Sequence, residues 1–489
     1  AINTGKLITI FSGAFLAIGG FLFGYDSGII SSTLAQEHFI EYFGGSISDS
    51  EAGGIVSSFT GGAIIGCLVV SFLADALGRR LTVFTGSVTA IFGCALQAGA
   101  TTIPMLIAGR LIAGLAVGIL SAVTPMYCSE IAQADIRGAL SGLLQWMLSW
   151  GFFVAQWLGY GCSHVDSHFQ WRFPLAFQVA PAFLMAVGIW FLSESPRWLI
   201  EKERYEEARL VLKRLHGNGD NDDFLEAEYQ EIHDTIIADR SVNAVHWKAL
   251  FTRPSWRRRL LLGCGVQAFG QLSGVNVINY YGPRIYESLG IDNQTSLMII
   301  GISGSLSIVW CSIGLWALER IGRVKPLIFS AVGCGLALVV NAVLSKYLPT
   351  ENGNQLRAMV AMNFVFSFFF TMTGIISWVY PAEIFPIEIR AKGNAIATLM
   401  NWSLNLVFAQ VSPLAFTAVG FRYFFAFFVF NLCAALSYGL FYPETAGRTL
   451  EQMDILFGDA TVAPAGKESG PTSWHGEGRE DVSETKPEK

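Results

Sequence analysis

The stretch Gly19-Gly-Phe-Leu-Phe-Gly-Tyr-Asp-Ser-Gly28 lies within the first long apolar run of the chain, which extends from Leu7 to Leu34. This run exceeds the roughly 18 to 20 residues that a membrane-spanning helix needs, and its single charged side chain is Asp26. An ionisable group at that depth costs about 2.5 to 3.5 kcal/mol on insertion scales, so it usually faces a partner charge or a water-filled cavity. We therefore expect the fold to supply one of these for Asp26.

The composition is that of a membrane protein. Of the 489 residues, 52% are hydrophobic and 14% are charged, and the mean hydropathy is +0.46, whereas soluble domains carry about 25% charged residues. Counting every uncharged run of sufficient length gives about twelve spans, which predicts a polytopic helical protein. The clearest runs are Ala52–Ala74, Gly138–Cys162, Phe173–Ser193, Ser296–Leu318, Ala358–Ala382 and Tyr423–Pro443.

Basic residues predict the orientation of the spans, because cytoplasmic loops carry an excess of Lys and Arg. With the spans numbered from the first, such residues occupy the turns after spans two, four, eight and ten: Arg79, Arg80, Arg137, Arg320, Arg323, Lys325, Arg390 and Lys392. The opposite loops Ala35–Ser50 and Gly99–Pro104 contain no Lys or Arg. We therefore expect these turns and both termini to be cytoplasmic.

Three motif pairs recur in the same order in the two halves of the chain, and the middle pair keeps an acid-to-base spacing of seven residues in both halves. The pairs are Asp75–Arg79 with Glu319–Arg323, Glu130–Arg137 with Glu383–Arg390, and Glu194–Arg197 with Pro443–Arg448. Two parallel six-helix repeats predict a binding site between them near the membrane midplane, opened to each side in turn.

This repeat divides the chain into four expected segments. They are a six-helix bundle at 1–195, a cytoplasmic helical linker at 196–257, a second six-helix bundle at 258–457 and a cytoplasmic tail at 458–489. Within the linker we expect helices at Glu201–Leu215 and Phe224–Ala238. The tail is rich in Gly, Pro, Ser, Glu and Lys, a composition typical of disorder.

Acidic and basic residues at the cytoplasmic helix ends predict a gate. Charge-assisted hydrogen bonds between them would hold the inner ends together and break as the protein opens inward. The arginines alone could merely satisfy the orientation rule, but the acids contribute nothing to that rule. The predicted gate consists of Arg79, Glu130, Arg137, Glu319, Arg323, Glu383 and Arg390.

Arg110 is the only other charge well inside the first half of the chain. At 1.5 Å per residue, Asp26 lies roughly 27 Å from the cytoplasmic start of its helix and Arg110 roughly 9 Å from an outer start. Both therefore lie in the outer half of a core about 30 Å thick, where neither charge is tolerable alone. Protonation of Asp26 would release Arg110, as a proton-coupled carrier requires; a static structural pair is the alternative.

Amide and aromatic side chains inside other spans suit a neutral ligand covered in hydroxyl groups, because amides both donate and accept hydrogen bonds and an aromatic plate can stack on a ring. Gln267 and Gln271 are four residues apart and share one helix face. Each amide could instead join neighbouring helices, but a set spread over four helices favours a polyol or sugar site. The expected binding residues are Gln145, Gln267, Gln271, Asn276, Trp378 and Asn401, with Tyr280 and Tyr281 closing over them as an extracellular gate.

From about Lys6 to Gly458 the sequence resembles the sugar porter family of the major facilitator superfamily, in the style of its fungal hexose and monosaccharide transporters. The motifs that carry the resemblance are Gly24-Tyr-Asp26, Gly78-Arg-Arg80, Gly109-Arg110, Pro125 to Arg137, Glu194 to Arg197, Gln271-Leu-Ser-Gly-Val-Asn276, Trp378 with Pro381-Ala-Glu383, Asn401-Trp402 and Pro443-Glu-Thr445. The resemblance implies an all-α membrane protein with the major facilitator fold, twelve transmembrane helices in two six-helix pseudo-repeats.

The resemblance also implies roles for individual residues. Asp26 and Arg110 align with the pair implicated in proton symport. The positions that align with sugar contacts are Gln145, Gln271, Asn276, Trp378 and Asn401.

Three positions depart from the family pattern. The paired Gln-Gln of span seven is Gly270-Gln271 here, so that Gln267, one turn back, is the candidate replacement. A frequent Asn of span eight is Ser307, and the second Gly-Arg-Arg is Gly322-Arg-Val324. The first two departures leave open which sugar is carried.

The sequence therefore predicts a plasma-membrane monosaccharide transporter that works by alternating access as a monomer in the lipid bilayer, with a sugar and a proton as its partners. A facilitative sugar uniporter and a non-transporting sugar sensor are the alternatives. The sequence contains no Gly-x-x-x-x-Gly-Lys-Ser/Thr motif and no catalytic or metal-binding constellation. We therefore expect no enzyme activity, no metal, no cofactor and no nucleic-acid partner.

Overall fold

The computed structural model describes residues 4–45, 47–133, 136–217, 222–242, 247–278, 286, 291–346, 353–448 and 450–458, and the regular elements in these ranges are helices. Eleven segments among them are long and apolar enough to cross a membrane. A further helix of 33 residues, α19 (Ile387–Val419), packs against α4 and α14 beside them. The expected all-α membrane fold is thereby confirmed.

The helices of the first half follow the predicted spans closely. They are α1 (Thr4–Leu16), α2 (Ile18–Leu34), α3 (Glu37–Tyr42), α4 (Asp49–Ala76), α5 (Arg79–Ala98), α6 (Ile103–Ile131), α7 (Arg137–Cys162), α8 (Phe169–Phe177), α9 (Val179–Gly188) and the 3₁₀ turn η1 (Ile189–Phe191). The first apolar run is one membrane-spanning segment, Thr4–Leu34, but Ala17 separates it into α1 and α2.

The remaining helices form the linker and the second half. They are α10 (Pro196–Glu201), α11 (Tyr205–His216), α12 (Asp222–Val242), α13 (Trp247–Thr252), α14 (Pro254–Leu272), α16 (Asn293–Ile321), α17 (Val324–Lys346), α18 (Gly353–Ile384), α19, α20 (Arg422–Phe441) and α21 (Leu450–Leu456). The two helices expected in the linker correspond to α11 and α12, and each begins and ends within about four residues of the prediction.

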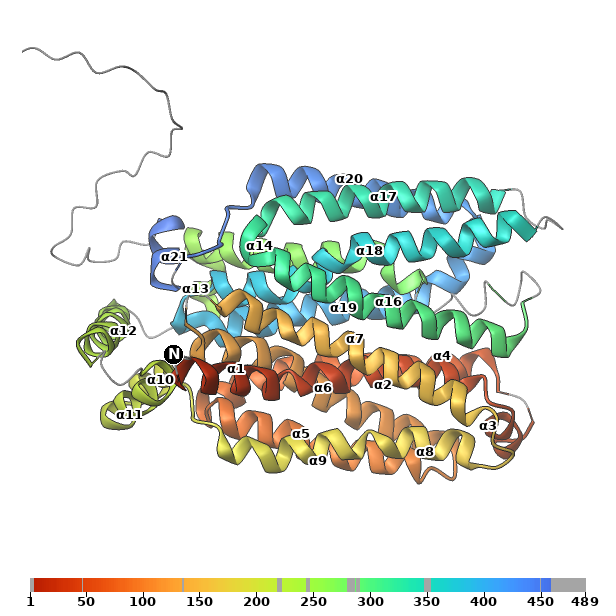
Figure 1. The fold of residues 1–489 in the computed structure, drawn as a ribbon, viewed down its shortest axis with the longest axis horizontal. Helices are drawn as coiled ribbons and strands as arrows, with labels where there is room; N and C mark the ends of the chain where they lie inside the picture. The colour runs from red at the N-terminus through yellow and green to blue at the C-terminus, as the bar shows by residue number, and fades with distance from the viewer. Residues whose placement is uncertain are drawn as a thin grey trace, which may run out of the picture.

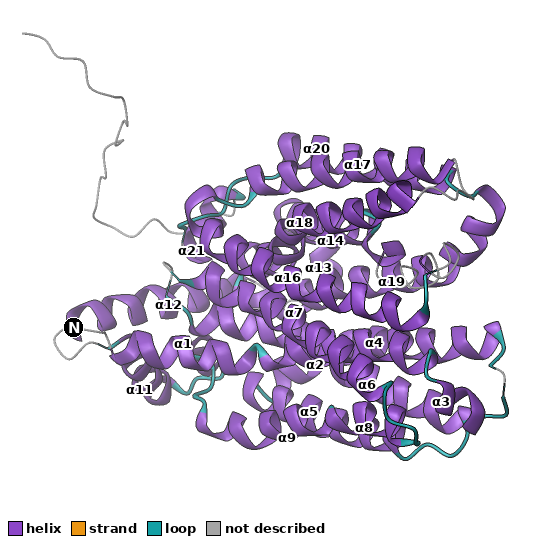
Figure 2. Ribbon diagram, turned by 45° about the vertical axis from the view of Figure 1, so that its right-hand side comes forward, coloured by secondary structure: helices purple, strands orange, loops and turns teal. Residues whose placement is uncertain are grey.

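The two halves of the chain lie side by side, with α1–α9 on one side and α14–α20 on the other (Figure 1). They meet where α7 packs against α16 and α18, and where α4 packs against α19. Helices α10–α12 and α21 lie beside the N-terminus at one end of the bundle, called here the linker end, and α3 lies at the opposite, far end (Figure 2). The helices that face one another across this boundary therefore include α4 and α7 from the first half and α16, α18 and α19 from the second.

The sequence repeat is also a repeat of local structure. Gly78 and Gly322 both have positive φ, +88° and +90°. The two backbone N–H groups that follow Gly78 donate to the Glu194 carboxylate at 3.0 and 3.1 Å, and the two that follow Gly322 donate to Glu444 at 2.9 and 3.1 Å. A Cβ on either glycine would lie 2.6 Å from the carboxylate that faces it. Glu194 can therefore cap the beginning of α5, and Glu444 that of α17, only because a glycine stands at the turn before each helix.

Candidate functional site

Glycines in the first apolar run bring α2 directly against α7. A Cβ at Gly24 would lie 1.9 Å from the backbone oxygen of Leu148, and one at Gly20 would lie 2.3 Å from that of Leu144. Neither position has room for a larger residue, because backbone atoms cannot yield as a side chain can. This close packing fixes the rotation of α2 and with it the direction of Asp26.

Asp26 and Arg110 form an ion pair in the interior of the first half. The Arg110 guanidinium donates through Nη1 to Asp26 Oδ1, and both side chains are at most 2% exposed. Arg110 also donates through Nε to the backbone oxygen of Ile55 at 3.3 Å, and its guanidinium carbon lies 4.6 Å from the centre of the Phe59 ring. The partner charge expected for Asp26 is thus in place between α2 and α6.

A cavity of about 110 Å³ lies between the two halves. One water needs roughly 10 to 15 Å³ by the same measure, so the space admits a small molecule. The cavity is lined from α2, α7, α14 and the residues after it, α18 and α19, by Phe23, Gly24, Ser27, Gln145, Leu148, Phe152, Gly270, Gln271, Val275, Asn276, Phe370, Gly374, Ser377, Trp378, Asn401 and Asn405. Five of the six residues predicted to bind the ligand are in this lining.

The sixth, Gln267, holds another lining residue in place. Its side chain is 1% exposed and donates through Nε2 to the backbone oxygen of Ser377 at 2.8 Å. Its Oε1 accepts a hydrogen bond from Asn401 Nδ2 at 2.7 Å. Gln267 is therefore placed behind Asn401, and the Asn401 carbonyl oxygen is the part of that amide left for the cavity.

Gln145 is oriented from the opposite half of the molecule. The indole N–H of Trp378 donates to Gln145 Oε1 at 3.1 Å, which leaves the Gln145 NH₂ group for a ligand. A third group of amides lies beside them, in which Asn276 Nδ2 donates to Gln271 Oε1 at 2.7 Å. Asn405 Nδ2 contacts both Gln271 Oε1 at 3.4 Å and Asn276 Oδ1 at 3.2 Å. These amides thus form hydrogen-bonded groups around the same cavity.

Aromatic rings connect the Asp26–Arg110 pair to this cavity. The Phe59 ring, which faces Arg110, lies 5.9 Å from Trp402, and Trp402 lies 4.7 Å from Phe23. Phe23 in turn lines the cavity and meets Trp378 edge to face at 6.1 Å. The ion pair and the cavity are therefore joined by packed side chains from both halves.

The sequence-based prediction missed several lining residues, among them Phe23, Ser27, Phe152 and Phe370. Phe23 and Ser27 belong to the same ten-residue stretch as Asp26, and a helical projection of that stretch would have placed them near the site. Phe152 and Phe370 gave no signal, because each stands beside other phenylalanines in its span, and the sequence does not show which ring faces the cavity. Tyr280 and Tyr281, the predicted extracellular gate, lie outside the described residues.

At the linker end, Glu130 joins arginines from both halves. Arg79 forms a two-pronged contact with it, through Nε to Oε2 and Nη2 to Oε1, both at 2.9 Å. Arg390 of the second half approaches Glu130 Oε1 at 3.7 Å. Within the described residues these are the ion pairs of Glu130, and the predicted pairing with Arg137, seven residues on, is not formed. Arg137 instead donates to the backbone oxygen of Ser129 at 3.1 Å.

The second half repeats this arrangement. Glu383 accepts a hydrogen bond from Arg323 Nη2 at 2.8 Å and another from the Thr445 hydroxyl at 2.8 Å. Arg390, the predicted partner of Glu383, donates to the backbone oxygen of Phe385 at 3.0 Å. The side chain of Glu319 lies outside the described part of the structure. Each acid therefore pairs with the arginine at the start of the preceding span, because that helix end lies opposite it in space.

The membrane-spanning helices and the amide-lined cavity between two repeats define a class of protein, the multi-pass membrane transporters. A family model described as "Sugar (and other) transporter" matches residues 13–457. The chain belongs to this sugar transporter family of the major facilitator superfamily.

Individual relatives are similar over nearly the whole chain. The MFS-type transporter criB of Aspergillus cristatus is 37% identical over 457 residues, which is 93% of this chain and 94% of that protein. The high-affinity glucose transporter of Kluyveromyces lactis is 32% identical over 468 residues, 91% of this chain and 84% of that protein. The proton:xylose symporter XylE bound to 6-bromo-6-deoxy-D-glucose superposes with a TM-score of 0.82 at 25% identity, covering 93% of this chain and all of that one.

Proposed function

We propose that this chain is a monosaccharide transporter of the plasma membrane, that its substrate is a hexose, and that it moves the sugar together with a proton. The observation that carries the proposal is the cavity between the two halves, which is lined by amides from both halves that hydrogen bonds hold in place. The name of the Kluyveromyces lactis relative supports a hexose, and that of XylE supports proton coupling to a monosaccharide.

The polarity of two amides supports a ligand made of hydroxyl groups. An indole N–H can only donate, so the bond from Trp378 requires Gln145 to accept through its oxygen and to offer its NH₂ group to the cavity. A backbone carbonyl can only accept, so Gln267 must donate to Ser377 and accept from Asn401. Asn401 then offers its oxygen. A ligand must accept at Gln145 and donate at Asn401, and a hydroxyl group does both.

Alternating access would proceed by relative rotation of two bodies, residues 1–195 and 258–457, about the cavity. We place the linker end and both termini in the cytoplasm, following the distribution of basic residues. The Glu130–Arg390 contact then joins the cytoplasmic ends of the two bodies and would break as the protein opens inward. Closure over the sugar from outside by Tyr280 and Tyr281 remains a prediction.

Proton coupling would act through Asp26. When this carboxylate accepts a proton, its attraction to Arg110 is lost, and the guanidinium is free to move against Phe59. The rings of Phe59, Trp402, Phe23 and Trp378 contact one another in that order. A shift of Arg110 would therefore change the side-chain packing at the sugar site. The protein works as a monomer in this scheme, since every residue invoked lies in one chain.

Uptake of radiolabelled glucose by cells that lack their own hexose transporters tests the proposal. We expect saturable uptake that is faster at acidic external pH and is competed by unlabelled hexoses more strongly than by polyols or disaccharides. Uptake that equilibrates without accumulation would indicate a facilitative uniporter. A protein that reaches the plasma membrane and moves no sugar would support the sensor alternative.

A further inference from the structure

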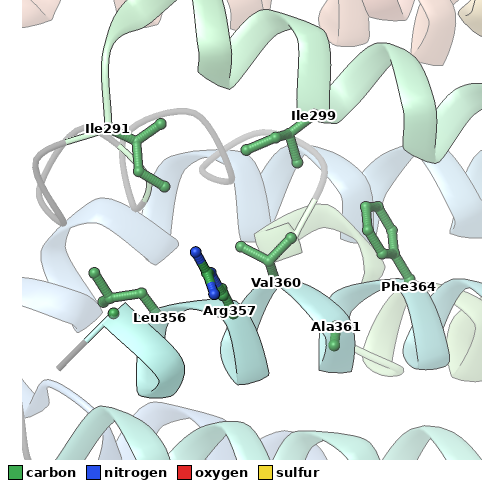
Figure 3. Close-up of a pocket in the computed structure, with 8 residues that line it drawn as sticks. Ile291, Ile299, Leu356, Arg357, Val360, Ala361 and Phe364 are labelled. Carbon is green, nitrogen blue, oxygen red and sulfur yellow. The ribbon is translucent and has the colours of Figure 1, made fainter.

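A second, larger pocket lies at the far end of the bundle, between α16 and the beginning of α18. Its volume is about 400 Å³, and its lining shares no residue with the cavity between the halves. Figure 3 shows side chains of both helices converging on this space. The lining residues are Ile291, Ile299, Gly353, Leu356, Arg357, Val360, Ala361 and Phe364.

The pocket opens toward the surface that contacts the lipid. Met298 and Ile302 on α16 are 36% and 39% exposed, and Val365 on α18 is 37% exposed. Met298 and Val365 are next in sequence to the lining residues Ile299 and Phe364, and Ile302 lies about one turn from Ile299. Apolar side chains exposed on a membrane-spanning helix face hydrocarbon, so the pocket is a groove open to the acyl chains of the bilayer.

Among the described residues of this lining, Arg357 is the single charged one. Its side chain is exposed, and it forms no hydrogen bond or ion pair with any described residue. Figure 3 shows its guanidinium extending from α18 toward the space between the helices. A guanidinium in this position presents two N–H groups to two oxygens of one anion, the geometry that suits a phosphate or carboxylate.

The depth of Arg357 matches that of a lipid headgroup. Helix α18 contains 32 residues, or about 48 Å at 1.5 Å per residue, which slightly exceeds the 40 to 45 Å of a bilayer with its polar layers. Arg357 is four residues, or about 6 Å, from the beginning of this helix. It therefore lies level with the phosphates, and the apolar lining residues Val360, Ala361 and Phe364 follow it into the hydrocarbon.

We propose that this groove binds one phospholipid of the leaflet at the far end, with an acyl chain between α16 and α18 and the phosphate on Arg357. A phospholipid uses both features of the groove, whereas a sterol or a free acyl chain would fill the apolar part and leave the guanidinium without a partner. The bound lipid would rest against two helices of the second half, α16 and α18, of which α18 carries Trp378.

Native mass spectrometry of the purified, delipidated full chain, titrated with palmitoyl-oleoyl-phosphatidylcholine, tests this proposal. We expect one lipid of high affinity, an affinity about tenfold weaker in Arg357→Gln, and loss of that lipid in Ala361→Trp, which fills the groove. Arg422→Gln is the matched control, because Arg422 is also an exposed arginine at the beginning of a helix, α20, and lines neither cavity. It should bind lipid within about twofold of the unmodified chain.

Two competitors separate the features of the ligand. Palmitoyl-oleoyl-glycerol, which lacks the phosphate, should bind about tenfold more weakly than the phospholipid, and inorganic phosphate should not displace the lipid. Equal binding by the unmodified chain and Arg357→Gln, equal losses in Arg357→Gln and Arg422→Gln, or equal binding of the two lipids would overturn the proposal. Arg357 is exposed, so its replacement does not threaten folding and decides the question even if Ala361→Trp is unstable.

Discussion

Trp378 donates its indole N–H to Gln145 across the boundary between the two halves of the chain, at 3.1 Å. The donor comes from α18 and the acceptor from α7, and both residues line the cavity. A single hydrogen bond thus sets the polarity of one amide and joins the two bodies that alternating access requires to separate.

Trp378→Phe should raise the KM for sugar several-fold while leaving the maximal rate nearly unchanged. The ring that would stack on the sugar remains, but the donor that orients Gln145 is lost, at about 0.5 to 1.5 kcal/mol. Initial rates of labelled glucose uptake provide the measurement. Trp310→Phe is the control, since the Trp310 indole nitrogen has no hydrogen-bond partner among the residues that the structure describes. A similar rise in KM for both variants would contradict the role given to Trp378.

Gln267 and Asn401 should behave as one unit. In a double-mutant cycle of sugar affinity, Gln267→Met and Asn401→Ala should each weaken binding, and the double variant should be little worse than either, with a coupling energy of about 1 kcal/mol. The reason is that Gln267 acts through Asn401, to which it is bonded at 2.7 Å.

The matched control for that cycle is Asn341→Ala combined with Asn401→Ala. Asn341 belongs to a separate pair, with Asn363 at 3.0 Å, so these two effects should add. Additive losses for Gln267 and Asn401 would mean that Gln267 contacts the sugar by itself, as its inclusion in the predicted binding set assumed.

Deoxy and deoxyfluoro sugars should show that Gln145 donates a hydrogen bond to the sugar and that Asn401 accepts one. Fluorine accepts but does not donate a hydrogen bond. At the hydroxyl facing Asn401, the deoxy and the deoxyfluoro sugar should therefore be equally poor competitors, and Asn401→Ala should remove that penalty. At the hydroxyl facing Gln145, the deoxyfluoro sugar should compete better than the deoxy sugar, and Gln145→Ala should abolish the difference. A scan in which no ring position behaves in either way would rule out the assigned orientations.

Glu130→Gln should weaken the closure of the linker end. The substitution removes the charge that Arg79 and Arg390 both face, and leaving buried charges without their partner costs several kcal/mol. Hydrogen exchange should accelerate at the end of α6, which carries Glu130, and at the beginnings of α5 and α19, which carry Arg79 and Arg390. Glu207→Gln, in an exposed pair with Arg204, should leave exchange in those helices unchanged, because exposed pairs contribute little.

The fold was predictable from the sequence because hydropathy and the position of basic residues depend on single segments. Asp26 and Arg110 were predictable as a pair for a similar reason, since they are the only charges deep in the first half. The residues around the cavity were predictable as a set, because amides inside apolar spans are rare and five of six are indeed in the lining.

Contacts between particular side chains were not predictable, because they depend on how each helix is rotated and on which helix lies opposite. Glu130 and Arg137 are close in sequence, but the turn between them directs Arg137 to the Ser129 backbone, while Arg79 reaches Glu130 from another helix. Gln267 shares a face with Gln271 but lies one turn nearer the linker end. There its NH₂ group donates to Ser377 and its oxygen accepts from Asn401, so neither group is left for the sugar.

The central claim is that Asp26 couples sugar movement to a proton, and Asp26→Asn tests it most directly. The substitution keeps the shape of the side chain and removes the charge that Arg110 pairs with. In energised cells or proton-loaded vesicles, we expect this variant to lose accumulation of labelled glucose above the external concentration while it still exchanges labelled for unlabelled sugar across the membrane. Accumulation equal to that of the unmodified chain would contradict the account.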